Sequence, residues 1–359
     1  MTEAAEPQRE DFLAGVPIAV DPAAIDHELS RLWKPSSASE GGETHVTRAC
    51  LANVIFDALD EGSRRRMEKV LPALGKRMPS RTIILLSDDA PPKKSDAGVL
   101  RASITAVCHL VSPGVPPVCC EQITLAAPPQ RADLIPGAVA PLLVPDVPVC
   151  FAAARDGGEH VLDLLDEILD KVVFDSRDLP LDALRRPLAV LNQKNPCAVD
   201  DLAWRETVEW RRIICEVFDN PNARAFLPEL VEVEVGHQAG GASRAGLLAG
   251  WVASRSGREL KVVLRETRET GPAPGEILWA RLSTGPGGRG PSLVVRRTDR
   301  NRVLRIEYHG ERACILPRLI PIREEGDAEL LGGAFERTTH QGVLRASLEA
   351  ACKLTPTAR

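Results

Sequence analysis

Few residues of this chain combine the types and spacing that a catalytic or metal site requires. The sequence contains no G-x-G-x-x-G after its first expected strand, no G-x-x-x-x-G-K-[ST], no H-E-x-x-H and no C-x-x-C. Its seven histidines are scattered singly, which is typical of surface or structural histidines rather than of metal ligands. One expected helix carries carboxylates that could exchange protons, although such an acidic face is usually solvated: Asp163, Asp166, Glu167 and Asp170. The sequence therefore predicts no catalytic residue, no bound cofactor and no metal.

Three further segments have a structural interpretation beside a chemical one. Ser243 lies in a Gly-Ala-Ser-Arg-Ala segment with the outline of a nucleophile elbow, but the strand before it ends near Val235, so we expect a helix N-cap. Cys119 and Cys120 are neighbours in an expected strand and point to opposite faces, so we expect two packing residues, with redox sensing as the alternative. The glycine-rich segment at 285–290 could approach a phosphate, but no helix follows it, which favours a hairpin loop.

The composition is that of a soluble globular protein of about two domains. Of the 359 residues, 44% are hydrophobic and 26% charged, which excludes wholesale disorder. Basic and acidic residues number 45 and 50 and aromatic residues make up 4%, and both values argue against nucleic-acid binding. No apolar run reaches the length of about 18 residues that a membrane span needs, and the acidic start MTEAAEPQRED does not resemble a signal peptide. Nine irregularly spaced cysteines are typical of a reducing compartment, so we expect a cytoplasmic protein without membrane or nucleic-acid partners.

The order of elements over residues 45–198 is typical of an α/β domain. Buried strands alternate with amphipathic helices, which predicts a mostly parallel sheet flanked by helices. Two strands at 100–111 and 118–127 are joined by a short proline-bounded turn, which indicates an antiparallel hairpin at the sheet edge. The other expected elements are strands at 50–59, 81–87, 148–153 and 171–175 and helices at 61–75, 131–143, 160–170 and 180–192.

The stretch from Asp200 to Asp219 predicts one helix that packs on two or more sides. Its polar residues fall on one narrow stripe, and nearly all the remaining arc is apolar, the reverse of a surface helix. We expect this helix to lie between domains, with i,i+4 ion pairs along the stripe that contribute about 0.2–0.5 kcal/mol each. The stripe consists of Arg205, Glu209, Arg212, Glu216 and Asp219, with the expected pairs Arg205–Glu209 and Arg212–Glu216.

Residues 199–359 are expected to form a smaller α+β domain that begins with this helix and contains an antiparallel meander. Residues 1–44 precede both domains as a polar arm, a short helix that begins after Asp21, and a linker at 34–44. The elements expected after the helix are strands at 230–235, 260–265, 277–283, 292–297 and 302–308 and helices at 243–256, 326–335 and 339–352.

Several motifs of the chain occur together and in order in one protein family. They are TRACLANVI (47–55), MPSRTIILL (78–86), EQITL (121–125) with LIPGAVAPLLVPDVPV (134–149), DLAWRETVEWR (201–211) with EVFD (216–219), and LLAGWVASR (247–255). In this order they resemble the glucose-6-phosphate dehydrogenase assembly protein family, called OpcA. The resemblance spans about residues 45–310, whereas the loop at 91–96, the stretch 284–291 and the C-terminal tail do not match.

The resemblance implies a non-catalytic protein that binds glucose-6-phosphate dehydrogenase, favours its active oligomer and raises its activity. Such an activator would regulate NADPH supply from the oxidative pentose phosphate pathway, and it would act through its differential affinity for two states of the enzyme. The shared motifs contain Trp and Arg, the residue types that dominate interface hot spots. The candidate interface residues are Trp204, Arg205, Trp210, Arg211 and Trp251.

These five residues also have a structural interpretation. Trp204 and Trp210 lie on the apolar arc of the expected helix, where core packing is the alternative to an interface. Arg205 falls on the exposed stripe. Arg211 falls inside the apolar arc, where a charge needs a buried partner or a carboxylate from another molecule.

A second hypothesis is an enzyme or metabolite-binding protein that acts on a sugar phosphate through the N-terminal α/β domain. Its ligand would lie at the carboxyl ends of the parallel strands, beside the loops that follow residues 87 and 153. Neither loop carries a cluster of Ser, His and Arg, which favours the hypothesis of a regulatory subunit.

Overall fold

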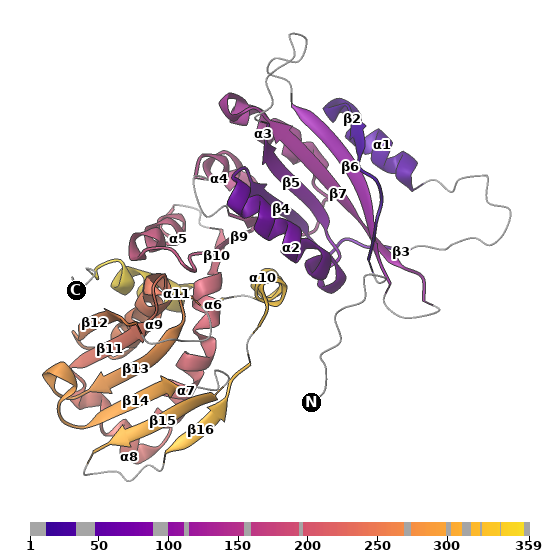
Figure 1. The fold of residues 1–359 in the computed structure, drawn as a ribbon. Helices are drawn as coiled ribbons and strands as arrows, with labels where there is room; N and C mark the ends of the chain where they lie inside the picture. The colour runs from indigo at the N-terminus through magenta and orange to yellow at the C-terminus, as the bar shows by residue number, and fades with distance from the viewer. Residues whose placement is uncertain are drawn as a thin grey trace. The chain divides into compact units, whose positions relative to one another are not determined.

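The computed structural model forms two compact units, which Figure 1 labels by element. The first consists of residues 1–173 and 327–335, and the second of residues 174–326 and 336–359. A domain boundary at residue 198 stays a prediction, and the expected linker at 34–44 lies outside the described residues. The structure describes residues 12–33, 47–88, 100–110, 115–153, 159–193, 197–268, 274–298, 303–310, 317–323, 325–337 and 339–354.

A mostly parallel sheet forms the centre of the first unit, with the strand order β1-β6-β7-β5-β4-β8-β9. The pairs from β7 through β5, β4 and β8 to β9 are all parallel, and β6 runs antiparallel to β7 as the expected hairpin requires. The strands are β1 (Phe12–Ala14), β2 (Ile18–Val20), β3 (Thr47–Arg48), β4 (Asn53–Ala58), β5 (Arg81–Ser87), β6 (Arg101–His109), β7 (Val118–Ala127), β8 (Val149–Ala152) and β9 (Lys171–Phe174).

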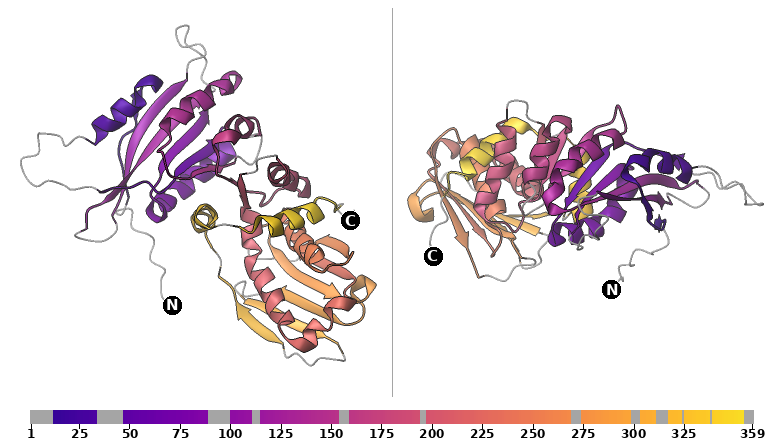
Figure 2. Two further views of the ribbon diagram at one scale, coloured as in Figure 1. Left: turned by 180° about the vertical axis from the view of Figure 1, so that it is seen from behind. Right: turned by 90° about the horizontal axis from the view of Figure 1, so that it is seen from above.

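Helices cover both faces of this sheet, which is why its central strands are apolar without alternation. All six residues of β4 are buried. Figure 2 shows α1 and α3 on one face and α2 on the other. Asp60 caps α2 by accepting a hydrogen bond from the Ser63 amide at 2.8 Å, and the helix buries Met67, Val70 and Leu74 against the sheet. The helices are α1 (Ile25–Leu32), α2 (Glu61–Arg77), α3 (Ile135–Val139), α4 (Glu159–Leu165) and α10 (Asp327–Glu336).

Two features of the first unit differ from the sequence-based expectation. The helix expected at 131–143 is a succession of short turns in which only Ile135–Val139 is α-helical, because Pro136 and Pro141 each lack the amide that a longer helix would need. The arm before α1 contains β1 and β2, which pair with β6 and were not expected. The fold class itself, a mostly parallel sheet between helices, is confirmed.

The second unit contains a sheet with the order β12-β11-β13-β14-β15-β16. β11 and β12 are parallel and joined through α9, whereas β11, β13, β14, β15 and β16 form the expected antiparallel meander. The strands of this sheet are β11 (Glu232–His237), β12 (Lys261–Glu266), β13 (Ile277–Ser283), β14 (Ser292–Arg297), β15 (Val303–His309) and β16 (Arg318–Pro321). The remaining elements of the unit are α5 (Arg185–Leu191), β10 (Ala198–Asp201), α6 (Leu202–Glu206), α7 (Val208–Phe218), α8 (Pro221–Arg224), α9 (Ala242–Arg255) and α11 (Gln341–Ala351).

The core of the second unit lies around α9, which packs against β11, β12 and α11. Gly250 permits the close approach of the two helices, because a Cβ atom there would lie 2.4 Å from the carbonyl oxygen of Ser347. Helices of this unit cover one face of the sheet, and none of its described helices lies on the other face (Figures 1 and 2).

Candidate functional site

The single helix expected from Asp200 to Asp219 is two helices, α6 and α7, that meet at Thr207. In a continuous helix the Trp204 carbonyl would accept from the Val208 amide. Instead it accepts from the amide and the hydroxyl of Thr207, at 3.2 and 2.8 Å, and from Nη2 of Arg211 at 3.1 Å. Hydroxyl groups of threonine compete in this way with helical hydrogen bonds, which explains the interruption.

Arg211 is half-buried and lies against Trp204. Its guanidinium carbon is 3.3 Å from the centroid of the Trp204 ring, and its Nε donates to the Thr207 carbonyl at 3.4 Å. Burial lowers the pKa of Arg211 to about 10, against the opposing effect of Asp200. Of the two alternatives expected from the sequence, a buried partner or a carboxylate from another molecule, the structure shows buried partners within the unit: an indole face and two backbone carbonyls.

Arg205 does not lie on an exposed stripe. Its Nε and Nη2 donate to Asp200 Oδ2 at 2.9 and 2.5 Å, and Thr339 Oγ1 donates to the same oxygen at 2.6 Å. The side chain of Asp200 is fully buried, so Arg205 compensates a buried charge instead of pairing with Glu209. Glu209 is bound by Arg212 at 2.8 Å, and the expected Arg212–Glu216 pair forms at 3.3 Å.

The tryptophans among the candidate interface residues are all buried. Trp204, Trp210 and Trp251 retain 4%, 2% and 9% of their surface exposed. α7 buries one face only and exposes Val208, so it is a surface helix of this unit rather than one packed on several sides. The structure brings Trp204 and Arg211 into contact, and the role of all five residues in an interface stays a prediction.

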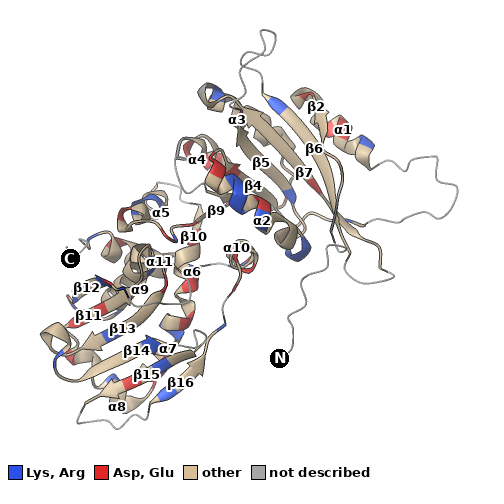
Figure 3. Cartoon of the chain, in the orientation of Figure 1, with Lys and Arg blue, Asp and Glu red and all other residues tan. Residues whose placement is uncertain are grey.

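The side of the second sheet that no described helix covers is called here the open face, and charged residues of both signs lie along its strands (Figure 3). Residues paired across antiparallel strands share a face, so the registers define which side chains form rows across it. One row consists of Glu234, Arg281, Val294 and Glu307, and the next of Gly236, Trp279, Arg296, Arg305 and Leu319.

Charge on the open face is arranged around buried carboxylates. Glu234 is buried and binds Arg265 at 2.6 Å and Arg281 at 3.2 Å. The guanidinium of Arg281 lies 5.4 Å from the ring of Trp279. That ring lies flat over Gly236, where a Cβ atom would come within 2.2 Å of it. Arginines therefore lie on this face around the Trp279 indole, which itself retains only 7% of its surface exposed. This arrangement is not among the sequence-based expectations, although the alternation of charged and apolar residues in 292–309 indicates one solvated face.

Arg296 and Arg305 lie directly opposite each other in the β14–β15 register. Like charges at such a pair destabilise a sheet. Arg305 is half-exposed and binds Glu307 at 2.6 Å. The row therefore places two guanidinium groups, each with an interaction of its own, near Leu319, which is 66% exposed.

The remaining chemical candidates have structural roles. Ser243 is not the N-cap of α9; it is buried, and its hydroxyl donates to the carbonyls of Leu179 and Pro180, both at 3.0 Å. The loop at 285–290 joins β13 to β14 as expected, and the amides of Gly287 and Gly288 bind the Glu232 carboxylate at 3.1 Å each. The carboxylates expected to be solvated are exposed: Asp163, Asp166, Glu167 and Asp170.

The expectation for Cys119 was wrong. Cys119 forms a disulfide with Cys108, its partner in the antiparallel register of β6 and β7. Cys120 is the buried packing residue that we expected, and burial raises the pKa of its thiol. A cross-strand disulfide cannot be read from irregular cysteine spacing, because the register has to be known first.

Within the described ranges, no group of three or more His, Cys, Asp and Glu side chains could hold a metal ion. None of the described helices is both long and apolar enough to cross a membrane. The loops at which the sugar-phosphate hypothesis would place a ligand fall largely outside the described residues, at 89–99 and 154–158.

The fold defines a two-unit α/β protein whose described residues include no metal cluster and whose second sheet has charged residues along its strands. Residues 72–193 match the family model for the N-terminal domain of the glucose-6-phosphate dehydrogenase subunit, and residues 197–348 match the model for its C-terminal domain. The chain belongs to this family, OpcA, and the resemblance seen in its motifs is confirmed.

Relatives among curated proteins are named OxPP cycle protein OpcA. The protein of Nostoc punctiforme is 30% identical over 202 residues, which are 55% of this chain and 41% of the relative. The protein of Synechocystis is 28% identical over 170 residues, covering 46% of this chain and 35% of the relative. The matched regions thus span less than half the length of these relatives.

Solved structures with a related outline are oxidoreductases. An NAD binding oxidoreductase from Klebsiella pneumoniae has a TM-score of 0.40 at 10% identity, covering 84% of this chain and 88% of the other. An oxidoreductase from Sinorhizobium meliloti has a TM-score of 0.38 at 11% identity with the same coverages. Likenesses this distant carry no argument about function.

Proposed function

We propose that this chain is a non-catalytic subunit that binds glucose-6-phosphate dehydrogenase in the cytoplasm and raises its activity. Membership of the family named for a subunit of that enzyme supports the proposal. The subunit would regulate NADPH supply by binding the active oligomer more tightly than other states. A coupling free energy of about 1–3 kcal/mol corresponds to an effect of about 5–150-fold on affinity.

The open face supplies the contact surface in this proposal. Arginine is one of the residue types that contribute most at interfaces, and Arg281, Arg296 and Arg305 lie on this face, whereas Trp279 is buried like the other tryptophans. Arg296 is exposed and Arg305 opposite it is half-exposed, so the guanidinium groups of both can contact an acidic group of a partner. We therefore expect the dehydrogenase to present carboxylates to this row.

The five residues singled out from the sequence act, in this proposal, by positioning. Trp204 and Arg211 hold α6 to α7, and Arg205 neutralises Asp200. Their buried side chains would support the unit that carries the open face rather than touch the enzyme.

The test is the activity of the dehydrogenase from the same cell at subsaturating glucose 6-phosphate, with increasing amounts of the purified chain. A saturable rise in activity, together with co-elution of the two proteins on a sizing column, supports the proposal. Absence of both effects, under reducing and under oxidising conditions, contradicts it.

A further inference from the structure

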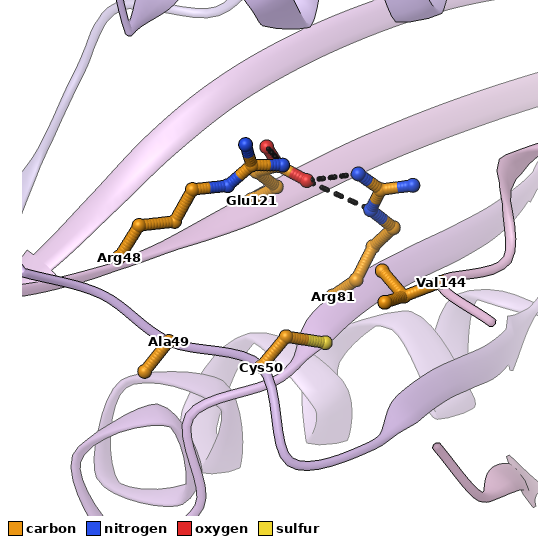
Figure 4. Close-up of a pocket in the computed structure, with 6 residues that line it drawn as sticks. All are labelled: Arg48, Ala49, Cys50, Arg81, Glu121 and Val144. Atoms are coloured by element: carbon orange, nitrogen blue, oxygen red, sulfur yellow. Dashed lines mark hydrogen bonds and ion pairs between the residues drawn. The ribbon is translucent and has the colours of Figure 1, made fainter. Parts of the chain in front are cut away.

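A pocket of about 230 Å³ opens in the first unit at the amino ends of its parallel strands (Figure 4). Arg81 is the first residue of β5, Cys50 precedes β4 and Val144 precedes β8. This edge is opposite to the carboxyl ends at which ligands of α/β sheets usually bind. The pocket lies below the range of about 300–1,000 Å³ that drug-sized ligands occupy, so it suits a small group. Its lining residues are Arg48, Ala49, Cys50, Arg81, Glu121 and Val144.

Two arginines converge on one buried carboxylate in this pocket (Figure 4). Arg81 donates from Nε and Nη2 to Glu121 Oε2, at 2.7 and 2.5 Å. Arg48 forms an ion pair with Oε1 of the same carboxylate, and Trp33 donates from Nε1 to Oε1 at 2.7 Å. The side chain of Glu121 is only 4% exposed and that of Arg81 10%, whereas Arg48, 51% exposed, lies at the mouth.

The hydrogen-bonding capacity left over on these side chains consists of donors. A carboxylate offers about four acceptor positions, and Glu121 already receives four contacts from Trp33, Arg48 and Arg81. Each guanidinium has five N–H groups. Arg81 uses three of them, two on Glu121 and one on the Leu142 carbonyl at 2.6 Å, and Arg48 uses one.

The net charge of the pocket also favours an anionic ligand. Two guanidinium groups around one carboxylate leave an excess of one positive charge in a partly enclosed pocket, where it is costly without a counter-charge. Arg48 is held in place by the Trp33 ring, 5.5 Å from its guanidinium carbon. The planar forks of arginine favour oxyanions that accept two parallel hydrogen bonds.

We propose that this pocket binds a small oxyanion, a phosphate or carboxylate group of a metabolite, between Arg48 and Arg81. Glu121 orients the two guanidinium groups and contributes no bond to the ligand. The site is independent of the proposed binding of the dehydrogenase, since all its residues belong to the first unit.

The experiment measures binding of inorganic phosphate and of acetate to the full chain, by calorimetry and by the shift of Tm, with sodium chloride holding the ionic strength constant. We expect saturable binding of one or both anions and a matching rise in Tm. The anion that binds more tightly identifies the phosphate or the carboxylate as the recognised group. Failure of both to bind saturably overturns the proposal.

Variants distinguish binding of an anion in the pocket from its nonspecific attraction to positive charge elsewhere on the protein. Arg48→Ala should weaken binding by about tenfold or more, since it removes charge-assisted hydrogen bonds. Arg101→Ala is the matched control, because Arg101 is an exposed arginine of the same unit that pairs with Asp88. Equal weakening by both variants contradicts the site. Arg48→Lys, which keeps the charge but loses the fork, provides the same comparison if the alanine variant does not fold.

Discussion

The guanidinium of Arg211 stacks 3.3 Å from the ring centroid of Trp204 and donates to the carbonyl oxygen of the same residue at 3.1 Å. One side chain thus covers the indole and, together with Thr207, donates to the carbonyl that lacks its helical partner because of the interruption. The pair ties α6 to α7. It also explains how a charge is tolerated on the apolar side of this helical segment without a carboxylate beside it.

The first prediction concerns this stack. Arg211→Ala should lower the free energy of unfolding by about 2 kcal/mol, because it removes a buried cation–π contact and two hydrogen bonds. Arg212→Ala is the control, since exposed pairs with Glu209 and Glu216 contribute less than about 1 kcal/mol. Urea unfolding measures both. If the two variants are equally stable, Arg211 does not hold the helices together.

The second prediction concerns the pH dependence of stability. Asp201 caps α6, accepting from the Ala203 amide at 2.8 Å and from Ser176 Oγ at 2.9 Å. Burial raises the pKa of Asp201 from 3.8 to about 7 although the hydrogen bond from Ser176 lowers it, so folding favours the protonated carboxyl. The contribution of Asp201 to the free energy of unfolding is fully present below about pH 4 and is lost as the pH rises through 7. The free energy of unfolding falls by no more than about 1.4 kcal/mol per pH unit from this group.

Asp201→Asn keeps the capping oxygen and removes the ionisation. Relative to wild type, the variant should therefore become more stable as the pH rises from 4 to 8. Chemical denaturation at several pH values measures this difference. A difference independent of pH would show that Asp201 titrates normally.

The third prediction concerns the disulfide between Cys108 and Cys119. It closes a segment with a sequence separation of 11, for which chain entropy gives a stabilisation of about 3 kcal/mol. Reducing agent should therefore lower the Tm of wild type to that of the double variant Cys108→Ser and Cys119→Ser, and leave the double variant unchanged. A wild type whose Tm does not respond to reduction would contradict the prediction.

The fourth prediction separates stability from binding on the open face. Arg296→Glu places a carboxylate opposite Arg305 in place of a like charge, which favours the sheet by about 0.2–1 kcal/mol, but it also removes the contact that Arg296 makes. The free energy of unfolding should therefore change by less than about 1 kcal/mol. Binding to the dehydrogenase should nevertheless weaken. A variant that is less stable than wild type by more than about 1 kcal/mol would contradict the prediction, because Arg296 would then have a structural role.

Most elements could be predicted because their sequence patterns are local. Strands such as Arg81–Ser87 and Ser292–Arg297 are short apolar runs bounded by turns, and the structure gives them the expected bounds. The interruption at Thr207 has only a weak local signal, one β-branched residue whose hydroxyl can bind a carbonyl. An apolar arc without Gly or Pro was therefore interpreted as one helix.

The surfaces depend on pairing between distant segments, which periodicity does not reveal. Arg296 faces Arg305 only through the register of β14 and β15, and Glu121 meets Arg48 and Arg81 only because β7 lies beside β3 and β5. The buried tryptophans show the converse: their residue type is typical of interfaces, but their place on the helix puts them in the core.

The account is tested most directly by the dissociation constant between the dehydrogenase and three forms of this chain: wild type, Arg296→Glu and Arg258→Glu. Arg258 is exposed in the turn between α9 and β12, away from the open face, and its replacement changes the net charge by the same amount. We predict that Arg296→Glu weakens binding by about tenfold or more, while Arg258→Glu binds like wild type. Equal affinity of all three forms, or no binding of wild type, would contradict the account.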